Sequence, residues 1–161
     1  MTLRESGGLL GVHKGKRQEL KMSERLTKHE IREGVFLLLY QHEISGTDID
    51  ELAGACEEAY EMMMTSETIK TAKAVAEKYE ELDAVIGEYS ETREVARISK
   101  VNKTILRLAI FEINYRGDKI PAKAAVNEAV ELAKKYAEKK DSAFINGILG
   151  NYIRKLGKDA D

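Results

Sequence analysis

Apolar residues recur along most of this chain at spacings of three and four, the repeat of one face of an α-helix. From about residue 29, short polar stretches separate seven such segments, which begin near residues 29, 47, 66, 92, 99, 121 and 142. The third runs from about Ser66 to Ile86 without a visible break. No segment alternates as a strand would, and no unit of 20–50 residues repeats. The sequence therefore predicts an all-α fold, a bundle of about seven helices.

Polar residues at the ends of these segments predict where helices start and stop. Gly46 is a plausible C-terminal stop after the first segment, because glycine readily adopts the left-handed conformation found there. The expected N-terminal caps are Thr47 in a capping box with Asp50, then Ser99, and Asp141 or Ser142 for the last helix.

One stretch conflicts with an all-helical interpretation. Asn146-Gly147 lies between apolar residues, and Asn-Gly is the strongest short signal for a β-hairpin. However, Phe144, Ile148 and Tyr152 recur every four residues, and a lone two-stranded hairpin is marginal in water. We therefore expect a helix that passes through both residues.

Helix-disfavouring residues inside helices need a structural reason. Gly147 costs about 1 kcal/mol relative to alanine, which a close approach between helices could offset. Asn127 and Asn146 stand at the edges of apolar stripes, so we expect structural amides with buried hydrogen-bond partners.

The 161 residues fit one domain, with 43% hydrophobic and 34% charged residues. We interpret residues 1–24 as a flexible basic arm carrying Lys14, Lys16, Arg17 and Lys21, and residues 25–161 as a single domain. Met22 is an alternative natural start. The chain has no apolar run near the roughly 18 residues of a membrane span, so a cytoplasmic protein is expected.

Charge is distributed unevenly along the chain. Residues 48–94 contain four Lys/Arg and 14 Asp/Glu, whereas residues 95–161 contain 14 Lys/Arg and eight Asp/Glu. Residues 1–33 are also basic, with eight Lys/Arg and five Asp/Glu. Basic ends around an acidic middle suggest two partners of opposite character, one of them nucleic acid. The alternative is ordinary variation among charged helix faces.

Residues with catalytic or metal-binding chemistry are nearly absent from the sequence. His29 and Glu30 begin like a zinc-protease motif, but Glu33 stands where the second histidine would be. Cys56 lies on an apolar helix face, which is typical of a core position. We therefore expect no enzyme, no cofactor and no metal site.

Three C-terminal segments, in order and spacing, resemble a known family. They are ISKVNKTILRLAIFEI (98–113), IPAKAAVNEAVELAKKY (120–136) and FINGILGNYIRKL (144–156). Nearer the N-terminus, REGVFLLLYQHEISG (32–46) and ELDAVI (81–86) are also similar to it. The family is that of the NusB antitermination factors, and the resemblance spans about residues 28–156.

This resemblance implies two packed three-helix bundles and a defined task in the bacterial cytoplasm. NusB-like proteins pair with a ribosomal protein of the small subunit, NusE, and bind single-stranded boxA RNA in nascent rRNA leader transcripts. With other Nus factors they join RNA polymerase, suppress termination and support rRNA synthesis and maturation, without catalysis. Family members occur as monomers and dimers, so a homodimer is left open.

The same resemblance assigns expected binding residues. For RNA they are Lys28, His29 and Arg32 in the first helix, and Lys139, Lys140, Asp141 and Phe144 around the loop before the last helix. An aromatic side chain beside lysines suits an unstacked base, although Phe144 could instead pack the last helix onto the core.

For the protein partner, the expected residues are Tyr40, Glu43, Asn102 and Arg107, with a structural ion pair as the alternative for Arg107. Two other functions stay open. NusB-like modules also stand at the front of rRNA cytosine methyltransferases, and the chain could be a helical interaction module that no longer binds RNA.

Overall fold

The computed structural model describes residues 26–158, so the predicted arm at residues 1–24 lies outside the described residues. Within residues 26–158 there are helices and no strands. The helices are α2 (Lys28–Ser45), α3 (Ile49–Tyr60), α4 (Ser66–Ala76), α5 (Tyr79–Tyr89), α6 (Lys100–Tyr115), α7 (Ala122–Tyr136) and α8 (Lys139–Lys155), with a short 3₁₀ turn, η1 (Val95–Arg97), before α6. The predicted all-α class is confirmed.

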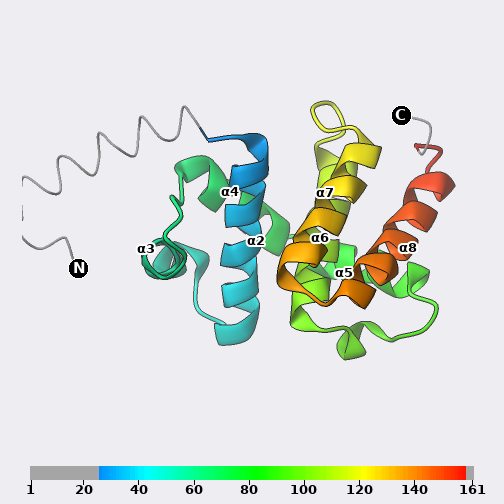
Figure 1. Ribbon diagram of the computed structural model, residues 1–161, viewed down its shortest axis with the longest axis horizontal. Coiled ribbons are helices and arrows are strands. Elements are labelled where there is room, and N and C mark those ends of the chain that lie inside the picture. Colours follow the sequence, from blue (N-terminus) through cyan, green and yellow to red (C-terminus); the bar gives the residue numbers. More distant parts are fainter. Residues whose placement is uncertain (1–25, 159–161) are drawn as a thin grey trace, which may run out of the picture.

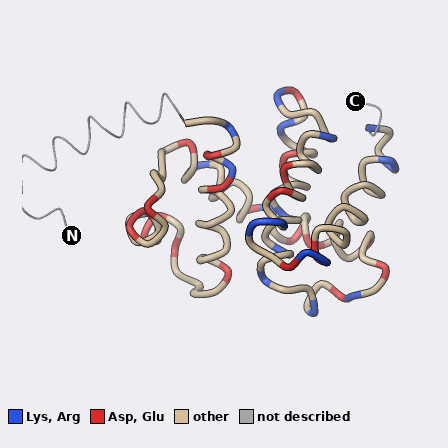
Figure 2. Tube along the Cα trace, in the orientation of Figure 1, with Lys and Arg blue, Asp and Glu red and all other residues tan. Residues whose placement is uncertain are grey.

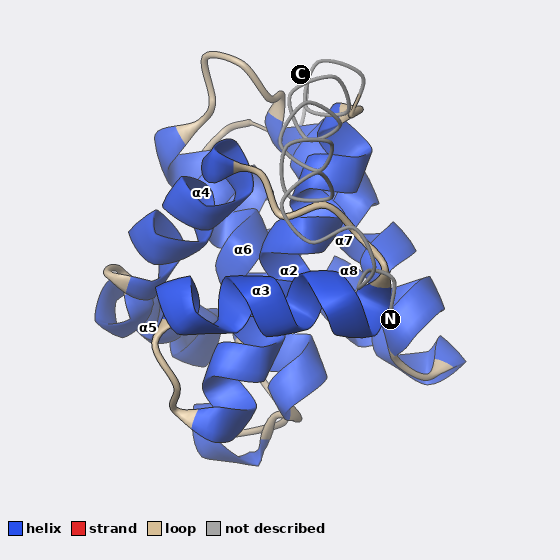
Figure 3. Ribbon diagram, turned by 90° about the vertical axis from the view of Figure 1, so that its left-hand side faces the viewer, coloured by secondary structure: helices blue, strands red, loops and turns tan. Residues whose placement is uncertain are grey.

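The helices form two groups that pack side by side (Figure 1). Helices α2, α3 and α4 contact one another and form the first bundle, with α3 on its outer side (Figure 3). Helices α6, α7 and α8 form the second bundle, and α5 packs against α6 and α8. Packing of α2 against α6 joins the two groups.

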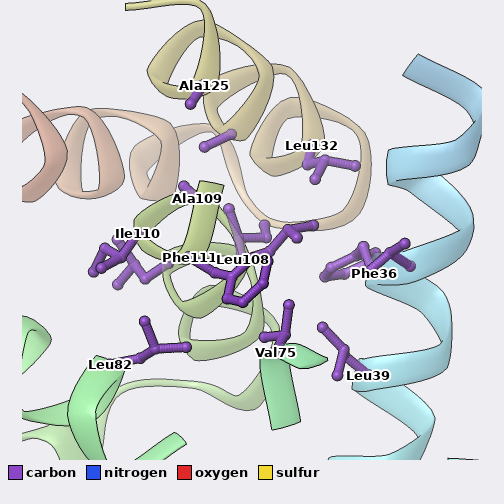
Figure 4. Close-up of a cluster of buried hydrophobic side chains, with 14 of the residues drawn as sticks. Phe36, Leu39, Val75, Leu82, Leu108, Ala109, Ile110, Phe111, Ala125 and Leu132 are labelled. Carbon is purple, nitrogen blue, oxygen red and sulfur yellow. The ribbon is translucent and has the colours of Figure 1, made fainter. Parts of the chain in front are cut away.

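Helix α6 is the centre of the core. Its residues from Thr104 to Ile113 are all buried, which means that this helix is enclosed by neighbours on every side. Figure 4 shows Phe36 of α2, Val75 of α4, Leu82 of α5 and Leu132 of α7 converging on it from different directions. The two bundles therefore share one continuous hydrophobic core.

The predicted third helix is in fact two helices. The chain turns at Glu77 and Lys78, where the Lys78 N–H bonds to the carbonyl of Val75 at 2.9 Å. Helix α4 packs on α2, whereas α5 packs on α6 and α8, so the chain must change direction between the two bundles. No glycine or proline marks this turn, and the apolar spacing continues across it. Tertiary packing, rather than local sequence, sets the break.

Of the helix-end predictions at Gly46, Thr47 and Ser99, two are confirmed. Gly46 ends α2 in the left-handed conformation, with φ of 73°. The Ser99 side chain accepts a hydrogen bond from the Asn102 N–H and caps α6. The cap predicted at Thr47 is wrong by one residue, because Asp48 caps α3 by accepting from the Asp50 N–H.

Helix α8 passes through Asn146 and Gly147, so the helical interpretation of the Asn-Gly stretch is confirmed. The predicted cap at Asp141 or Ser142 is wrong, since α8 already begins at Lys139. The Glu138 N–H donates to the Asp141 carboxylate at 3.1 Å, so Asp141 stabilises the start from within the first turn.

Candidate nucleic-acid interface

The first turn of α2 presents part of the predicted RNA-binding group. Lys28 is exposed, and His29 is exposed with its Nδ1 2.7 Å from Glu128 Oε1 of α7. Thr27 and Glu30 form a reciprocal capping box: the Thr27 hydroxyl accepts from the Glu30 N–H, and the Thr27 N–H donates to Glu30 Oε1. Glu30 therefore stabilises the helix start that carries the two basic residues.

Arg32 lies inside the protein rather than on its surface. Its side chain is 8% exposed, with Nε 2.7 Å from Glu112 Oε2 of α6 and Nη1 3.3 Å from Glu128 Oε1 of α7. Burial raises the pKa of Glu112, which the Arg32 charge offsets only in part. This geometry makes Arg32 an ion-pair link between the bundles, and it favours that role over direct RNA contact.

A second link, from the next residue of α2, joins that helix to the end of α7. The Glu33 carboxylate is 2.5 Å from Lys135 Nζ and accepts a hydrogen bond from the Tyr136 hydroxyl. Burial opposes the charge on Glu33, but the bonds from Lys135 and Tyr136 outweigh it, and the pKa of Glu33 is lowered. Sequence reasoning missed this pairing because its members are far apart in the chain.

The other predicted RNA-binding group lies in the first turn of α8. Lys139 and Lys140 are exposed, and Lys140 makes only a long ion pair, 3.9 Å, with the exposed Glu138. Phe144 is half-buried and packs against the core. The guanidinium of Arg93, from the loop after α5, lies 4.4 Å from the centre of its ring. Phe144 thus packs on the core and is also covered by a cation that sequence reasoning missed.

The two basic groups lie apart on the molecule. In Figure 1 the first turn of α2 is at the top and the first turn of α8 is near the bottom, with α7 running between them. Figure 2 shows further basic residues at the end of α7, which are Lys134 and Lys135. A hollow of about 230 Å³ that includes His29, Lys134 and Lys135 connects α2 to this end of α7.

Lys28 also borders a larger cleft on the other side of α2. This cleft has a volume of about 490 Å³ and lies between α2, α4 and the C-terminal part of α6. Lys70, Arg116 and Lys119 contribute three more cations to its walls. The start of α2 is therefore the corner of a wider basic surface.

Two of the predicted partner-binding residues, Glu43 of α2 and Arg107 of α6, meet beside Asp83 of α5. Arg107 is 5% exposed and binds Asp83 through Nε and Nη2, at 2.7 and 2.8 Å. Its Nη1 donates to Glu43 at 2.8 Å, and its guanidinium lies 3.8 Å from the centre of the Tyr79 ring. Of the two roles considered for Arg107, the structure shows the structural ion pair.

The predicted partner-binding residues differ in how far they are exposed. Asn102 is 1% exposed, and its Oδ1 has no hydrogen-bond partner among the described residues. Burial raises the pKa of Tyr79 to about 12, so its hydroxyl stays protonated at neutral pH. Tyr40 and Glu43 are only half-buried, and the Tyr40 ring stacks on Phe36 at 5.9 Å between centroids. Direct partner contact is therefore open to Tyr40 and Glu43.

Glu43 should make stability depend on acidity. Burial opposes its charge, but the bonds and charge of Arg107 outweigh burial and hold its pKa below the ordinary value of 4.5. Its stabilising contribution is complete above that value and is lost as pH falls through the lowered folded-state pKa. We expect Glu43→Gln to flatten the acid-side loss of unfolding free energy, followed by urea denaturation from neutral pH to about 3. The exposed Glu58→Gln should keep the wild-type decline, and an unchanged decline in Glu43→Gln would contradict this assignment.

The three residues predicted to be structural lie on the surface instead. Asn127, Asn146 and Gly147 are all exposed, so buried amide hydrogen bonds at the two asparagines are excluded. A Cβ added at Gly147 would meet nothing within 4 Å, so no close helix approach requires glycine there. The prediction was wrong because residues at the edge of an apolar stripe can face either the core or solvent.

Neither metal coordination nor membrane insertion gains support from the described residues. No group of three or more His, Cys, Asp or Glu side chains in residues 26–158 could hold a metal ion. None of the helices in that range is long and apolar enough to cross a membrane.

Comparison with known proteins gives one consistent result. The family model described as the NusB family matches residues 29–154. A transcription antitermination protein NusB from Acetivibrio thermocellus is 39% identical over 132 residues, which cover 81% of this chain and 90% of the relative. One from Agathobacter rectalis is 39% identical over 137 residues, covering 79% and 99%.

Solved structures agree with the sequence relatives. NusB from T. maritima superposes with a TM-score of 0.69 at 26% identity, covering 81% of this chain and 92% of the other. The antitermination factors NusB and NusE in complex with dsRNA give a TM-score of 0.66 at 25% identity, covering 80% and 96%. Sequence and fold therefore lead to the same assignment: the chain belongs to the NusB family.

Proposed function

We propose that this protein is a transcription antitermination factor that binds boxA RNA of nascent rRNA leaders together with NusE. It would act in the cytoplasm as part of an RNA polymerase complex with other Nus factors. The observation that carries the proposal is similarity to antitermination proteins over almost their whole length, 90% and 99% for the two relatives named above. A solved complex of NusB and NusE with dsRNA on the same fold supports both kinds of partner.

The RNA-binding face in this proposal runs from the start of α2, along α7, to the start of α8. Lys28, beside the exposed His29, supplies a cation at one end, and Lys139 and Lys140 supply cations at the other. Arg93 and Phe144 offer a stacked pair beside the second group, suited to an unpaired base. Lysine contacts to phosphates position an RNA strand but carry little sequence information.

The partner surface in this proposal includes Tyr40 and Glu43, at the far end of α2 from Lys28. The ion pair of Arg107 with Glu43 and Asp83 fixes the Glu43 carboxylate at the edge of that surface. The acidic stretch 48–94, with 14 Asp/Glu against four Lys/Arg, favours the approach of a basic ribosomal protein.

Titration of labelled boxA RNA tests the proposal. We expect NusE to tighten binding and a scrambled RNA to bind more weakly. The triple variant Lys28→Ala/Lys139→Ala/Lys140→Ala should lose affinity and flatten the salt dependence by about 0.7 for each phosphate contact removed. Lys155→Ala, an exposed lysine at the opposite end of α8, is the matched control. Equal binding of scrambled RNA, with no effect of NusE, would refute the function.

The two alternative functions gain no specific support. The named relatives are antitermination proteins and not methyltransferases, and the described residues keep exposed cations at both predicted RNA-binding positions. A homodimer stays a prediction.

A further inference from the structure

A shallow polar hollow lies between α7 and α8, on the path from one basic group to the other. Its volume is about 410 Å³, and it is widely open to solvent. It is lined by Asn127, Val130, Glu131 and Lys134 of α7 and by Ser142, Ala143 and Asn146 of α8. Two carboxamides from different helices therefore face one space.

The residues at this hollow are poor choices for helix stability. Asn127 and Asn146 are exposed within helices, where asparagine is less favourable than alanine. Gly147, beside Asn146, weakens the helix further and has no packing requirement. Residues that oppose the local structure without a structural gain are expected at functional sites.

We propose that this hollow binds one unstacked nucleobase of single-stranded RNA, with its edge hydrogen-bonded by Asn127 and Asn146. The inference rests on the proposed RNA-binding function and adds a site for base recognition to it. Each carboxamide offers an acceptor and two donors, which is the pattern that a base edge complements. Val130 and Ala143 supply apolar contacts for the ring.

The charges in the hollow fit a base better than a phosphate. Lys134 and Glu131 are its only charged residues, and their side chains lie 3.4 Å apart, so they largely balance one another. Glu131 would repel a phosphate but could accept a hydrogen bond from an exocyclic amino group. The exposed lysines at the start of α8, Lys139 and Lys140, are better placed to contact phosphates.

The position of the hollow also fits a strand that contacts both basic groups. Glu131 and Lys134 line this hollow and also the one that contains His29, so the two are neighbours. At the other side, Ser142 and Ala143 lie between Lys140 and Phe144 in the first turns of α8. An RNA strand that reached from His29 to the first turn of α8 would cross this hollow by way of Glu131 and Lys134.

The test compares Asn127→Ala, Asn146→Ala and the double variant with wild type, using boxA and scrambled RNA at two salt concentrations. Each single change should weaken boxA binding about tenfold, as expected for loss of a paired base contact, and leave scrambled RNA unaffected. The salt dependence should not change, because no phosphate contact is removed. Asn151→Ala, an asparagine of α8 outside the hollow, is the matched control.

Thermal unfolding of the same variants separates recognition from folding. Alanine is the better helix former, so the melting temperature should be unchanged or higher while boxA affinity falls. If wild type discriminates between the RNAs and the variants discriminate equally well, the base site is refuted and the proposed function stands. If both RNAs lost affinity equally and the salt dependence became flatter, the asparagines would be phosphate contacts. That result would also refute the base site. If wild type shows no discrimination, the base site is refuted, and the proposed function fails with it when NusE also leaves the affinity unchanged.

Discussion

Replacing Arg107 with alanine should lower the free energy of unfolding by about 3–5 kcal/mol, the usual cost of breaking a buried ion pair from one side. The loss arises because Glu43 and Asp83 would keep their charges without the guanidinium that binds both. The Tyr79 ring would also lose the cation packed 3.8 Å from its centre. Urea denaturation at neutral pH measures the change.

Two further variants test whether the loss in Arg107→Ala comes from the ion-pair network. Arg97→Ala, at an exposed arginine in η1, should change stability by no more than about 0.5 kcal/mol. Neutralising both acids as well, in Arg107→Met/Glu43→Gln/Asp83→Asn, should recover part of the loss, because neither carboxylate is then left charged without the guanidinium. The recovery should be incomplete, because Lys103 Nζ, 3.6 Å from Glu43, loses its partner. A single Arg107→Ala variant as stable as wild type would show that the network contributes nothing.

Phe36→Ala should cost a similar amount, about 3–5 kcal/mol, through the cavity it leaves in the core. Phe36 is 1% exposed and extends from α2 toward the second bundle (Figure 4). Its ring lies 5.0 Å from that of Tyr136 at the end of α7, measured between centroids. The cavity would therefore open at the junction of the two bundles.

Phe36→Leu fills most of the same space and should cost clearly less than Phe36→Ala. Phe144→Ala is a second comparison, because that ring is only half-buried and its removal leaves a smaller cavity. Thermal and urea unfolding would rank the three variants. If Phe36→Ala were no worse than Phe144→Ala, the junction would not depend on the packing seen here.

Much of the fold could be predicted from spacing alone. The all-α class, the stop at Gly46, the cap at Ser99 and the helix through Asn146 all follow from local rules, and the structure agrees. The turn at Glu77 and Lys78 could not be predicted, because the apolar spacing continues unchanged from α4 into α5. The same spacing gives α4 its face toward α2 and α5 its face toward α6. Only the tertiary arrangement separates the two.

Some features of the candidate site could likewise be predicted from the sequence, and others could not. Exposed lysines at helix starts, such as Lys28 and Lys139, are readable from sequence. The sequence does not show whether a basic residue is already held in an ion pair, because the partners of Arg32 and Arg107 come from distant segments. Asn127 shows the converse error: a polar residue beside an apolar stripe was assigned to the core, although it faces solvent.

The two-residue turn between α4 and α5 has a consequence for how two ligands would be held. Only Glu77 and Lys78 separate α4 from α5, α2 packs along α6, and the two bundles share one core. This packing would hold the Tyr40 end of α2 and the first turn of α8 at one spacing and mutual orientation before any ligand arrives. Such preorganisation removes the entropic cost of aligning them during assembly, so cooperativity between RNA and protein partner would come from contacts between the two ligands themselves.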